Sequence, residues 1–369
     1  MKKRILFLIS DTGGGHRSSA LALAQVFSEK YNITCLLPDF FREGTKPPFR
    51  NFPDAYADIT KKRNYFYGLL WYGIYPEPFY KFLNWIVDIT SPNGLREFYE
   101  RHYPFDCVVS CHALLNHFPL QTLRRYYHKI PFYIVVIDLL SLHTGWFERG
   151  ADFYFLPIPE SEFFFLKRGF PKEKLGVYGF PIRKEFFLLQ NKEELKGKFG
   201  VEDKKVVLII GGGEGIGQIK EVASSFLKKT DYQILIVTGR NEVLFKSLSE
   251  TYWSERRIRV FGFVNNIYEL LSISDLCITK AGSSTIMEAV AKKVPLILMN
   301  YTYGQEAGNV RWVERRGLGF YEKEPAEILI KAQRILETDL GGKIKEKMGK
   351  INLAGASERI CEKIVQLLE

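Results

Sequence analysis

Polar residues follow an apolar run at residues 276–279, and their types suit the recognition of an anion and a diol. Lys280, Ala281 and Gly282 follow the run, and the helical pattern after them starts with the hydroxyl side chains of Ser283, Ser284 and Thr285. A helix N-terminus presents free backbone N–H groups and the positive end of the helix dipole, which together favour a phosphate. Glu288, about one turn later, is placed to accept hydrogen bonds from a ribose diol.

A second polar group follows the next apolar run, at residues 295–299. Gln305, Glu306 and Asn309 offer donors and acceptors that suit a sugar ring. Phosphate, ribose and hexose contacts within one short segment indicate a nucleotide-sugar site. A simpler explanation exists for part of the pattern, because Thr285 and Glu288 have the T-x-x-E spacing of a capping box.

His16 is the residue best suited to proton transfer. It follows Gly13, Gly14 and Gly15 at the end of an apolar run over 4–9 and opens a helical pattern that continues to about residue 29. The glycines allow close approach of a substrate to the backbone, and the helix dipole favours a neutral imidazole. We therefore expect a general base, the alternative being a helix-start histidine bonded to a neighbouring carbonyl.

Two further histidines come at the expected ends of strands. His112 follows the run 107–110, and His143 follows Asp138, which comes at the end of the run 132–137. Open α/β sheets bind ligands at the carboxyl ends of their strands, so both histidines are candidate ligand contacts. Each histidine alone is also consistent with a polar residue satisfied within a loop.

Short apolar runs alternate with helical patterns along most of the chain, which predicts parallel sheets and an α/β fold. The expected strands are residues 4–9, 33–37, 107–110, 132–137, 153–156, 206–210, 234–238, 259–261, 276–279 and 296–299. Each half starts with a strand that leads into a glycine cluster. We expect two Rossmann-like domains, residues 1–182 and 183–355, and a C-terminal helix at 356–369 that packs back on the first.

The second glycine cluster has five glycines within residues 211–217. We interpret it as a flexible loop that cradles a diphosphate or contacts the sugar. Neither cluster matches G-x-G-x-x-G, because Ser18 and Ile216 occupy the third position, and no Gly-Lys-Ser/Thr follows either one. A dinucleotide oxidoreductase and a Walker-type nucleotide site are thus weakly supported.

The overall composition indicates which kinds of partner and which cellular compartment to expect. The 369 residues carry a net charge of +10, which predicts attraction to an anionic partner such as nucleotide phosphates, anionic lipid or nucleic acid. Five cysteines, odd in number and mostly within apolar runs, indicate free thiols in a reducing compartment. No signal peptide, no membrane-spanning helix and no metal site are expected.

Residues 40–105 have a different character, since aromatic side chains alternate there with lysine and arginine. Aromatic and basic residues together suit the headgroup layer of a membrane. The same mixture can stack on single-stranded nucleic acid, and it is also compatible with a packed helical insertion that has a basic surface.

Seven segments in order make the chain resemble the monogalactosyldiacylglycerol synthases and the processive diacylglycerol glucosyltransferases. More distantly, it resembles the N-acetylglucosaminyltransferases that act on peptidoglycan lipid intermediates. The segments are DTGGGHR (11–17), GFPIR (179–183), GGGEGIG (211–217), GRN (239–241), GFV (262–264), KAGSSTIMEA (280–289) and GQEAGN (304–309).

The resemblance implies a GT-B fold, two Rossmann-like domains facing across a cleft, and inverting transfer from a UDP-sugar to diacylglycerol without a cofactor or metal. His16 then looks like the base, Asp138 a second catalytic residue, and Gly14, Gly15, His112, His143 and Trp146 the acceptor side. The UDP-sugar residues implied are Gly212, Gly213, Gly239, Phe263, Val264, Gly282, Ser283, Ser284, Thr285, Glu288, Gln305, Glu306 and Asn309. Phe263 and Val264 would contact uracil through the backbone.

The chain departs from the plant pattern at two places, with Ser283-Ser284 in place of Pro-Gly and His112-Ala113 in place of His-Pro. It lacks a plastid-targeting extension, so we expect a bacterial enzyme peripherally bound to the cytoplasmic face of the cell membrane. The expected partners are UDP-sugar, diacylglycerol and an anionic membrane, without nucleic acid. A transferase to another acceptor, a nucleotide-sugar epimerase and a non-enzymatic binding protein are the alternatives.

Overall fold

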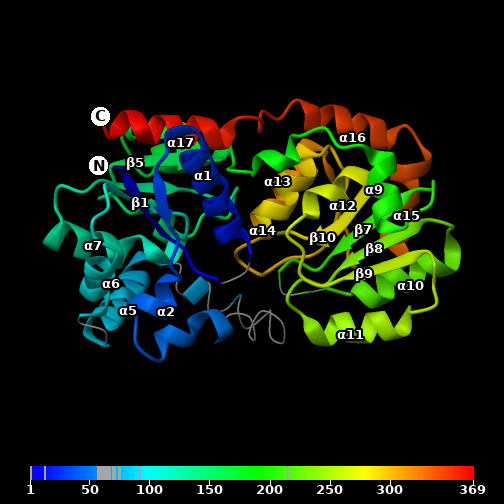
Figure 1. Ribbon diagram of the computed structural model, residues 1–369, viewed down its shortest axis with the longest axis horizontal. Coiled ribbons are helices and arrows are strands. Elements are labelled where there is room, and N and C mark those ends of the chain that lie inside the picture. Colours follow the sequence, from blue (N-terminus) through cyan, green and yellow to red (C-terminus); the bar gives the residue numbers. More distant parts are fainter. Residues whose placement is uncertain are drawn as a thin grey trace. The chain divides into compact units, whose positions relative to one another are not determined.

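The computed structural model describes residues 2–11, 14–55, 68, 72–73, 76–90, 93–213, 215 and 217–369. The chain divides into two compact units (Figure 1). Unit 1 comprises Met1–Arg183, Tyr303–Gln305 and Gly355–Glu369, and unit 2 comprises Lys184–Thr302 and Glu306–Ala354. Part of the aromatic and basic segment predicted at 40–105, including residues 56–67, lies outside the described residues.

Unit 1 is built on a six-stranded parallel sheet with the order β2-β1-β3-β4-β5-β6 among the described residues. Its strands are β1 (Arg4–Leu8), β2 (Thr34–Leu36), β3 (Cys107–Ser110), β4 (Phe132–Val135), β5 (Phe153–Leu156) and β6 (Leu175–Val177). Its helices are α1 (Gly15–Tyr31), α2 (Phe40–Gly44), α5 (Glu77–Thr90), α6 (Gly94–His102), α7 (His117–Tyr126), α8 (Pro159–Lys167) and α17 (Ala356–Leu367). The 3-10 turns are η1 (Phe49–Asn51), η2 (Ala113–Leu115), η3 (Thr144–Phe147) and η4 (Lys172–Lys174).

Unit 2 contains a second six-stranded parallel sheet, with the order β12-β11-β10-β7-β8-β9 in the described part of the chain. Its strands are β7 (Val206–Ile210), β8 (Gln233–Val237), β9 (Ile258–Phe261), β10 (Leu276–Lys280), β11 (Leu296–Asn300) and β12 (Gly319–Tyr321). The helical elements are η5 (Lys184–Phe186), α9 (Lys192–Phe199), α10 (Ile219–Lys229), α11 (Glu242–Thr251), α12 (Ile267–Ile273), α13 (Ser283–Ala291), α14 (Ala307–Arg316), α15 (Pro325–Glu337) and α16 (Leu340–Gly349).

Continuous apolar runs form the central strands because helices cover both faces of a parallel sheet. Every residue of β3, β4, β5, β7 and β8 is buried. All ten strands expected from the sequence are present, with ends that differ by at most a few residues. The three-residue strands β6 and β12 were not predicted, and the α/β fold class is confirmed.

The C-terminal helix α17 packs against α1 within unit 1 (Figure 1). Ile360, Cys361 and Ile364 are fully buried there. The hydroxyl of Ser357 donates to the carbonyl oxygen of Ile182 over 2.9 Å and accepts from its N–H over 3.1 Å. The chain end is therefore fastened to unit 1 by apolar contacts and by backbone hydrogen bonds.

All five cysteines are free, and four of them are buried, as the sequence predicted. No helix in the described residues combines the length and the apolar character needed to cross a membrane.

We expect Ile360→Ala to lower the free energy of unfolding by about 2–5 kcal/mol, because it leaves a cavity between α17 and α1. Chemical denaturation followed by circular dichroism measures the change. Glu362→Ala, at an exposed position on the same helix, is the control and should shift the transition little. Equal effects of the two substitutions would show that α17 does not contribute a packed face.

Candidate active site

The sheet of unit 1 has a switch point between β1 and β3, because the chain leaves β1 toward β2 and returns on the other side. Ligands of open α/β sheets bind at such a point, beyond the carboxyl ends of the strands. His16 lies there in the first turn of α1, and Cys111 and His112 directly follow β3. Nδ1 of His16 is 2.8 Å from the carbonyl oxygen of Cys111, and the His16 and His112 rings are 4.1 Å apart.

The contact with Cys111 determines which nitrogen of His16 can act as a base. A carbonyl oxygen only accepts, so Nδ1 carries the hydrogen and the lone pair lies on Nε2. Burial lowers the pKa of His16 to about 4, although the hydrogen bond to Cys111 acts in the opposite direction. His16 is thus a neutral imidazole near pH 7, and its Nε2 carries the lone pair that could accept a proton.

His112 and His143 have the opposite arrangement. Nδ1 of His112 accepts from the N–H of Leu114 over 3.2 Å, and Nδ1 of His143 accepts from the N–H of Gly145 over 3.0 Å. Burial lowers the pKa of His143 to about 4, and burial together with the neighbouring histidines holds the pKa of His112 well below its usual value. Both neutral rings therefore carry their hydrogen on Nε2 and can donate it.

Asp138 and Trp146 form a buried pair beyond the carboxyl end of β4. The indole Nε1 of Trp146, which is fully buried, donates to a carboxylate oxygen of Asp138 over 2.7 Å. Trp146 belongs to η3, the turn whose N-cap is His143. This contact fixes η3 and with it His143, whereas a catalytic role for Asp138 remains a prediction.

The glycine segment before α1 is bracketed by a salt bridge. The guanidinium of Arg17 donates to both carboxylate oxygens of Asp11, over 2.5 and 3.1 Å. Gly14 is the N-cap of α1, and among the described residues beyond its chain neighbours and its own helix no atom lies within 4 Å of the position that a Cβ would take there. Gly15 is the first residue of α1. Open space next to this N-terminus agrees with the predicted close approach of a substrate; Thr12 and Gly13 lie outside the described residues.

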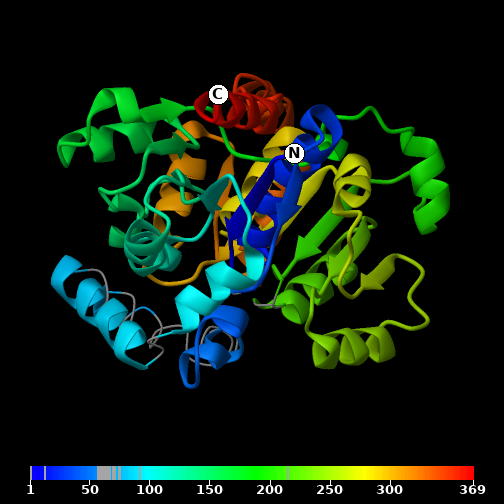
Figure 2. The same ribbon diagram turned by 60° about the vertical axis from the view of Figure 1, so that its left-hand side comes forward.

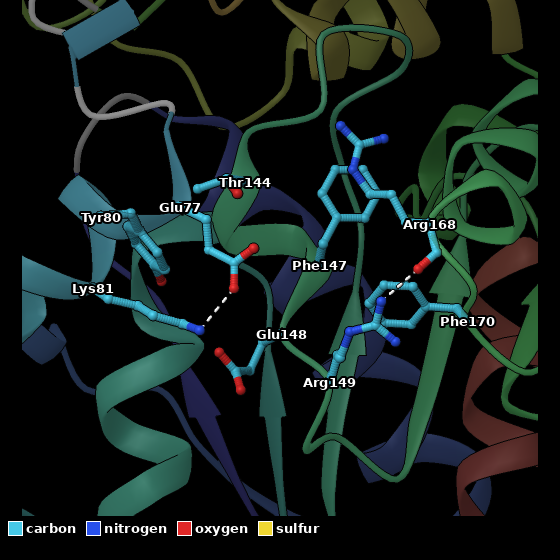
Figure 3. Close-up of a pocket in the computed structure, with 9 residues that line it drawn as sticks. All are labelled: Glu77, Tyr80, Lys81, Thr144, Phe147, Glu148, Arg149, Arg168 and Phe170. Atoms are coloured by element: carbon cyan, nitrogen blue, oxygen red, sulfur yellow. Dashed lines mark hydrogen bonds and ion pairs between the residues drawn. The ribbon is translucent and has the colours of Figure 1, made fainter.

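A pocket of about 170 Å³ lies near His143 in unit 1 (Figure 3). Tyr80 of α5 forms part of its wall, and the Tyr80 ring is 5.6 Å from that of His143. Two cations of the lining have partners within it: Lys81 pairs with Glu77 over 2.7 Å, and the Arg168 guanidinium lies 4.0 Å from the Phe147 ring centre. Tyr80, whose hydroxyl donates to the carbonyl oxygen of Ala113 over 3.3 Å, therefore places the start of α5 next to His143.

In unit 2 the switch point lies between β7 and β10. The glycine cluster after β7 packs tightly on the turn after β8. A Cβ on Gly239 would come within 2.5 Å of the carbonyl oxygens of both Gly212 and Gly213, and the N–H of Arg240 donates to Gly213 over 2.8 Å. Backbone contacts therefore join the described part of this cluster to the turn after β8, and the flexible loop remains a prediction; residues 214 and 216 are outside the described part.

Helix α13 begins at Ser283, with Gly282 as its N-cap and no side-chain cap. Thr285 is therefore the third residue of the helix and cannot be its capping residue, so the capping-box explanation of Thr285 and Glu288 is wrong. Asn309 is buried, and its amide donates to the carbonyl oxygen of Ala281 over 2.8 Å. It holds the turn before α13, whose first N–H groups are not bonded by a cap.

The residues predicted to contact uracil and ribose lie at two different places in unit 2. Glu288 is buried on α13, with 9% of its surface exposed. Phe263 is 57% exposed, with the Arg240 guanidinium 5.5 Å from its ring centre, and Val264 is half-buried. An exposed ring beside an arginine is a surface on which a nucleobase can stack.

The two residues predicted to contact the sugar, Gln305 and Glu306, are neighbours in sequence but group with different units. One carboxylate oxygen of Glu306 accepts from Nζ of Lys280 over 2.6 Å, and the other accepts from the N–H of Thr302 over 2.7 Å. Sequence reasoning gave Lys280 no role. A lysine directly at the end of an apolar strand was the available signal.

Comparison with known proteins identifies the family. Residues 16–182 match the family described as monogalactosyldiacylglycerol (MGDG) synthase, and residues 206–350 match the glycosyltransferase family 28 C-terminal domain. A probable monogalactosyldiacylglycerol synthase 2 of Oryza sativa subsp. indica is 31% identical over 339 residues, which cover 88% of this chain and 72% of that protein. The chain belongs to the MGDG synthase family.

The Spinacia oleracea MGDG synthase is 35% identical over 344 residues, 88% of this chain and 65% of that protein. The chain thus spans less than two thirds of the length of this relative. Among solved structures, the kitacinnamycin glycotransferase has a TM-score of 0.63 at 11% identity and covers 100% of this chain and 99% of its own. The MnaA–UDP structure of S. aureus has a TM-score of 0.60 at 16% sequence identity, and the match covers 100% of this chain and 97% of that one. These likenesses confirm the GT-B fold class.

The buried histidines predict an acid-dependent loss of stability. The pKa of His143 is about 4 in the folded chain and about 6.5 when unfolded. Between these values the unfolded chain binds a proton that the folded chain does not, so stability falls as the pH drops from 6.5 to 4. His143→Gln should reduce this pH-dependent loss by about 3 kcal/mol.

Denaturant titrations at pH 7, 5.5 and 4.5 measure the slope for both proteins. His128→Gln, at an exposed position, is the control and should keep the slope of the unsubstituted chain. An unchanged slope in His143→Gln would contradict the neutral, buried state of that ring.

Proposed function

We propose that this chain transfers a hexose, galactose or glucose, from a UDP-hexose to the hydroxyl of 1,2-diacylglycerol at a membrane surface, with inversion of the anomeric configuration. Membership of the MGDG synthase family supports the reaction class. The observation that carries the proposal is the hydrogen bond from His16 to Cys111, since it leaves Nε2 of a neutral imidazole as the proton acceptor at the switch point of unit 1.

The proposed step is a single displacement. Nε2 of His16 takes the proton of the acceptor hydroxyl, and the acceptor oxygen forms a bond to the anomeric carbon. The bond from that carbon to the diphosphate oxygen breaks, and its electron pair stays on UDP. The uncapped N-terminus of α13 offers about half a unit of positive charge to the diphosphate, so the step as proposed uses no metal.

The remaining groups of unit 1 suit orientation of the acceptor. The Nε2–H groups of His112 and His143 are donors whose tautomer is fixed by backbone N–H groups. In the proposed complex His112 and His143 line the acceptor side, while Asp138 acts through Trp146 on η3.

Helix α5 supports a peripheral membrane role. Its exposed side carries Phe79, Phe82, Trp85 and Ile89, each between 44% and 54% exposed, whereas Tyr80 and Asn84 are buried on the other side. In Figure 2 this helix, drawn in light blue, lies at the edge of unit 1. An apolar stripe on the solvent side of an amphipathic helix suits insertion into the interfacial layer of a membrane. The location that we propose is the inner face of the cell membrane. It borders the cytoplasm, a reducing compartment in which thiols stay free.

The direct test is incubation with diacylglycerol vesicles and a panel of UDP-hexoses, followed by mass spectrometry of the lipids. A product heavier by one hexose is expected, with and without a chelator. His16→Ala should lower kcat by about 10²- to 10⁴-fold while the affinity for UDP stays unchanged, because only the base is lost. Near-normal turnover of His16→Ala would exclude this base, and the absence of any hexosyl lipid would exclude the function.

The membrane role has its own test. Replacing Phe82 and Trp85 together by Ser should lower the vesicle-bound fraction in flotation, by about tenfold or more in the partition coefficient, because two inserted aromatic side chains are lost. Leu189→Ser removes a fully exposed apolar side chain of unit 2 and is the matched control. Unchanged flotation of the double variant would assign the stripe to another partner.

A further inference from the structure

Lys280 is a partly buried lysine at the candidate donor site of unit 2. It is the last residue of β10, and its side chain is 15% exposed. Nζ donates to Oε1 of Glu306 over 2.6 Å and to Oγ1 of Thr302 over 3.2 Å. The second carboxylate oxygen of Glu306 accepts a hydrogen bond from the N–H of Thr302. Lys280, Glu306 and Thr302 are therefore all hydrogen-bonded to one another.

The backbone around Lys280 is irregular. Strands β10 and β11 pair in regular register through Thr279, and the register then shifts so that Lys280 lies opposite Asn300. Such an irregularity re-aims the side chain that follows it and is frequent next to active sites.

Two glycines of the candidate donor site border this group. A Cβ on Gly212, in the glycine cluster, would lie 3.4 Å from Cε of Lys280. A Cβ on Gly282, the N-cap of α13, would lie 3.7 Å from Oε1 of Glu306. The ammonium is therefore placed between the glycine cluster and the uncapped helix N-terminus, where β7 and β10 diverge.

Stability alone gives a weak reason for this ion pair. Removing two charges from water costs about as much as their attraction returns, and apolar residues of similar size often do as well. A ligand supplies a better reason. An ammonium has three N–H groups, and among the described residues two of them have the partners named above, which leaves one for an anion.

We propose that Lys280 binds the diphosphate of the nucleotide sugar and stabilises the charge that UDP gains as the sugar leaves, with Glu306 and Thr302 as its positioning residues. The inference rests on the proposed function and deepens it. It gives Glu306 a different role from the predicted sugar contact, since its two oxygens orient the lysine and the turn before α14. A fixed cation in a partly dry site stabilises developing charge more than a mobile one, because it needs no reorganisation.

The test compares UDP with uridine, which lacks the diphosphate, in calorimetric titrations of the full chain. Lys280→Met should lower the affinity for UDP by about 10- to 100-fold, the range of a charge-assisted hydrogen bond, while the affinity for uridine changes less than about twofold. Lys280→Gln, whose amide can still donate to Glu306, should show the same selective loss. It serves as the folded variant if the methionine destabilises unit 2.

Lys331→Met is the matched control, because it breaks a half-buried pair of the same kind, with Glu322 over 2.5 Å, and should leave both affinities unchanged. UDP affinity within twofold of the unsubstituted chain in both Lys280 variants would overturn the role of Lys280 and leave the proposed function standing. Equal losses for UDP and uridine would also overturn it, since they indicate a general disturbance of the site. No binding of UDP by the unsubstituted chain would overturn both.

Discussion

Both units depend on the divergence of the chain from a central strand of a parallel sheet. In unit 1 the chain leaves β1 in one direction and β3 continues in the other, and β7 and β10 have the same relation in unit 2. The helices that follow such strands start at the carboxyl edge, so their free N–H groups and first-turn side chains gather there. His16 in α1 and the Ser283 end of α13 occupy these positions.

The groups at these two places are costly to bury, and each is oriented by a backbone contact or by a second residue. His16, His112 and His143 are kept neutral by burial, and carbonyl or N–H groups of the main chain select their tautomers. Lys280 is charged and is oriented by Glu306 and Thr302. In the proposed reaction these groups have separate tasks: His16 in unit 1 accepts a proton, and Lys280 in unit 2 supplies positive charge to the diphosphate.

The sequence predicted the main strands because contiguous apolar runs encode them, and it predicted the starts of α1 and α13 because glycines follow the runs before these helices. Strands β6 and β12 were not predicted, because the three-residue segments Leu-Gly-Val and Gly-Phe-Tyr are too short to show a hydrophobic periodicity. The capping-box alternative was wrong because the N-cap lies three residues earlier than the T-x-x-E spacing assumes. The contacts of Asp138 with Trp146 and of Lys280 with Glu306 join residues 8 and 26 positions apart, so only the folded chain shows them.

The anomeric configuration of the hexose in the lipid product, read by proton NMR, tests the single displacement most directly. UDP-hexoses carry an α-linked sugar, so attack by an acceptor oxygen activated by His16 predicts a β-linked glycolipid. An α-linked product would contradict this mechanism, because retention requires a second displacement through a group other than this base.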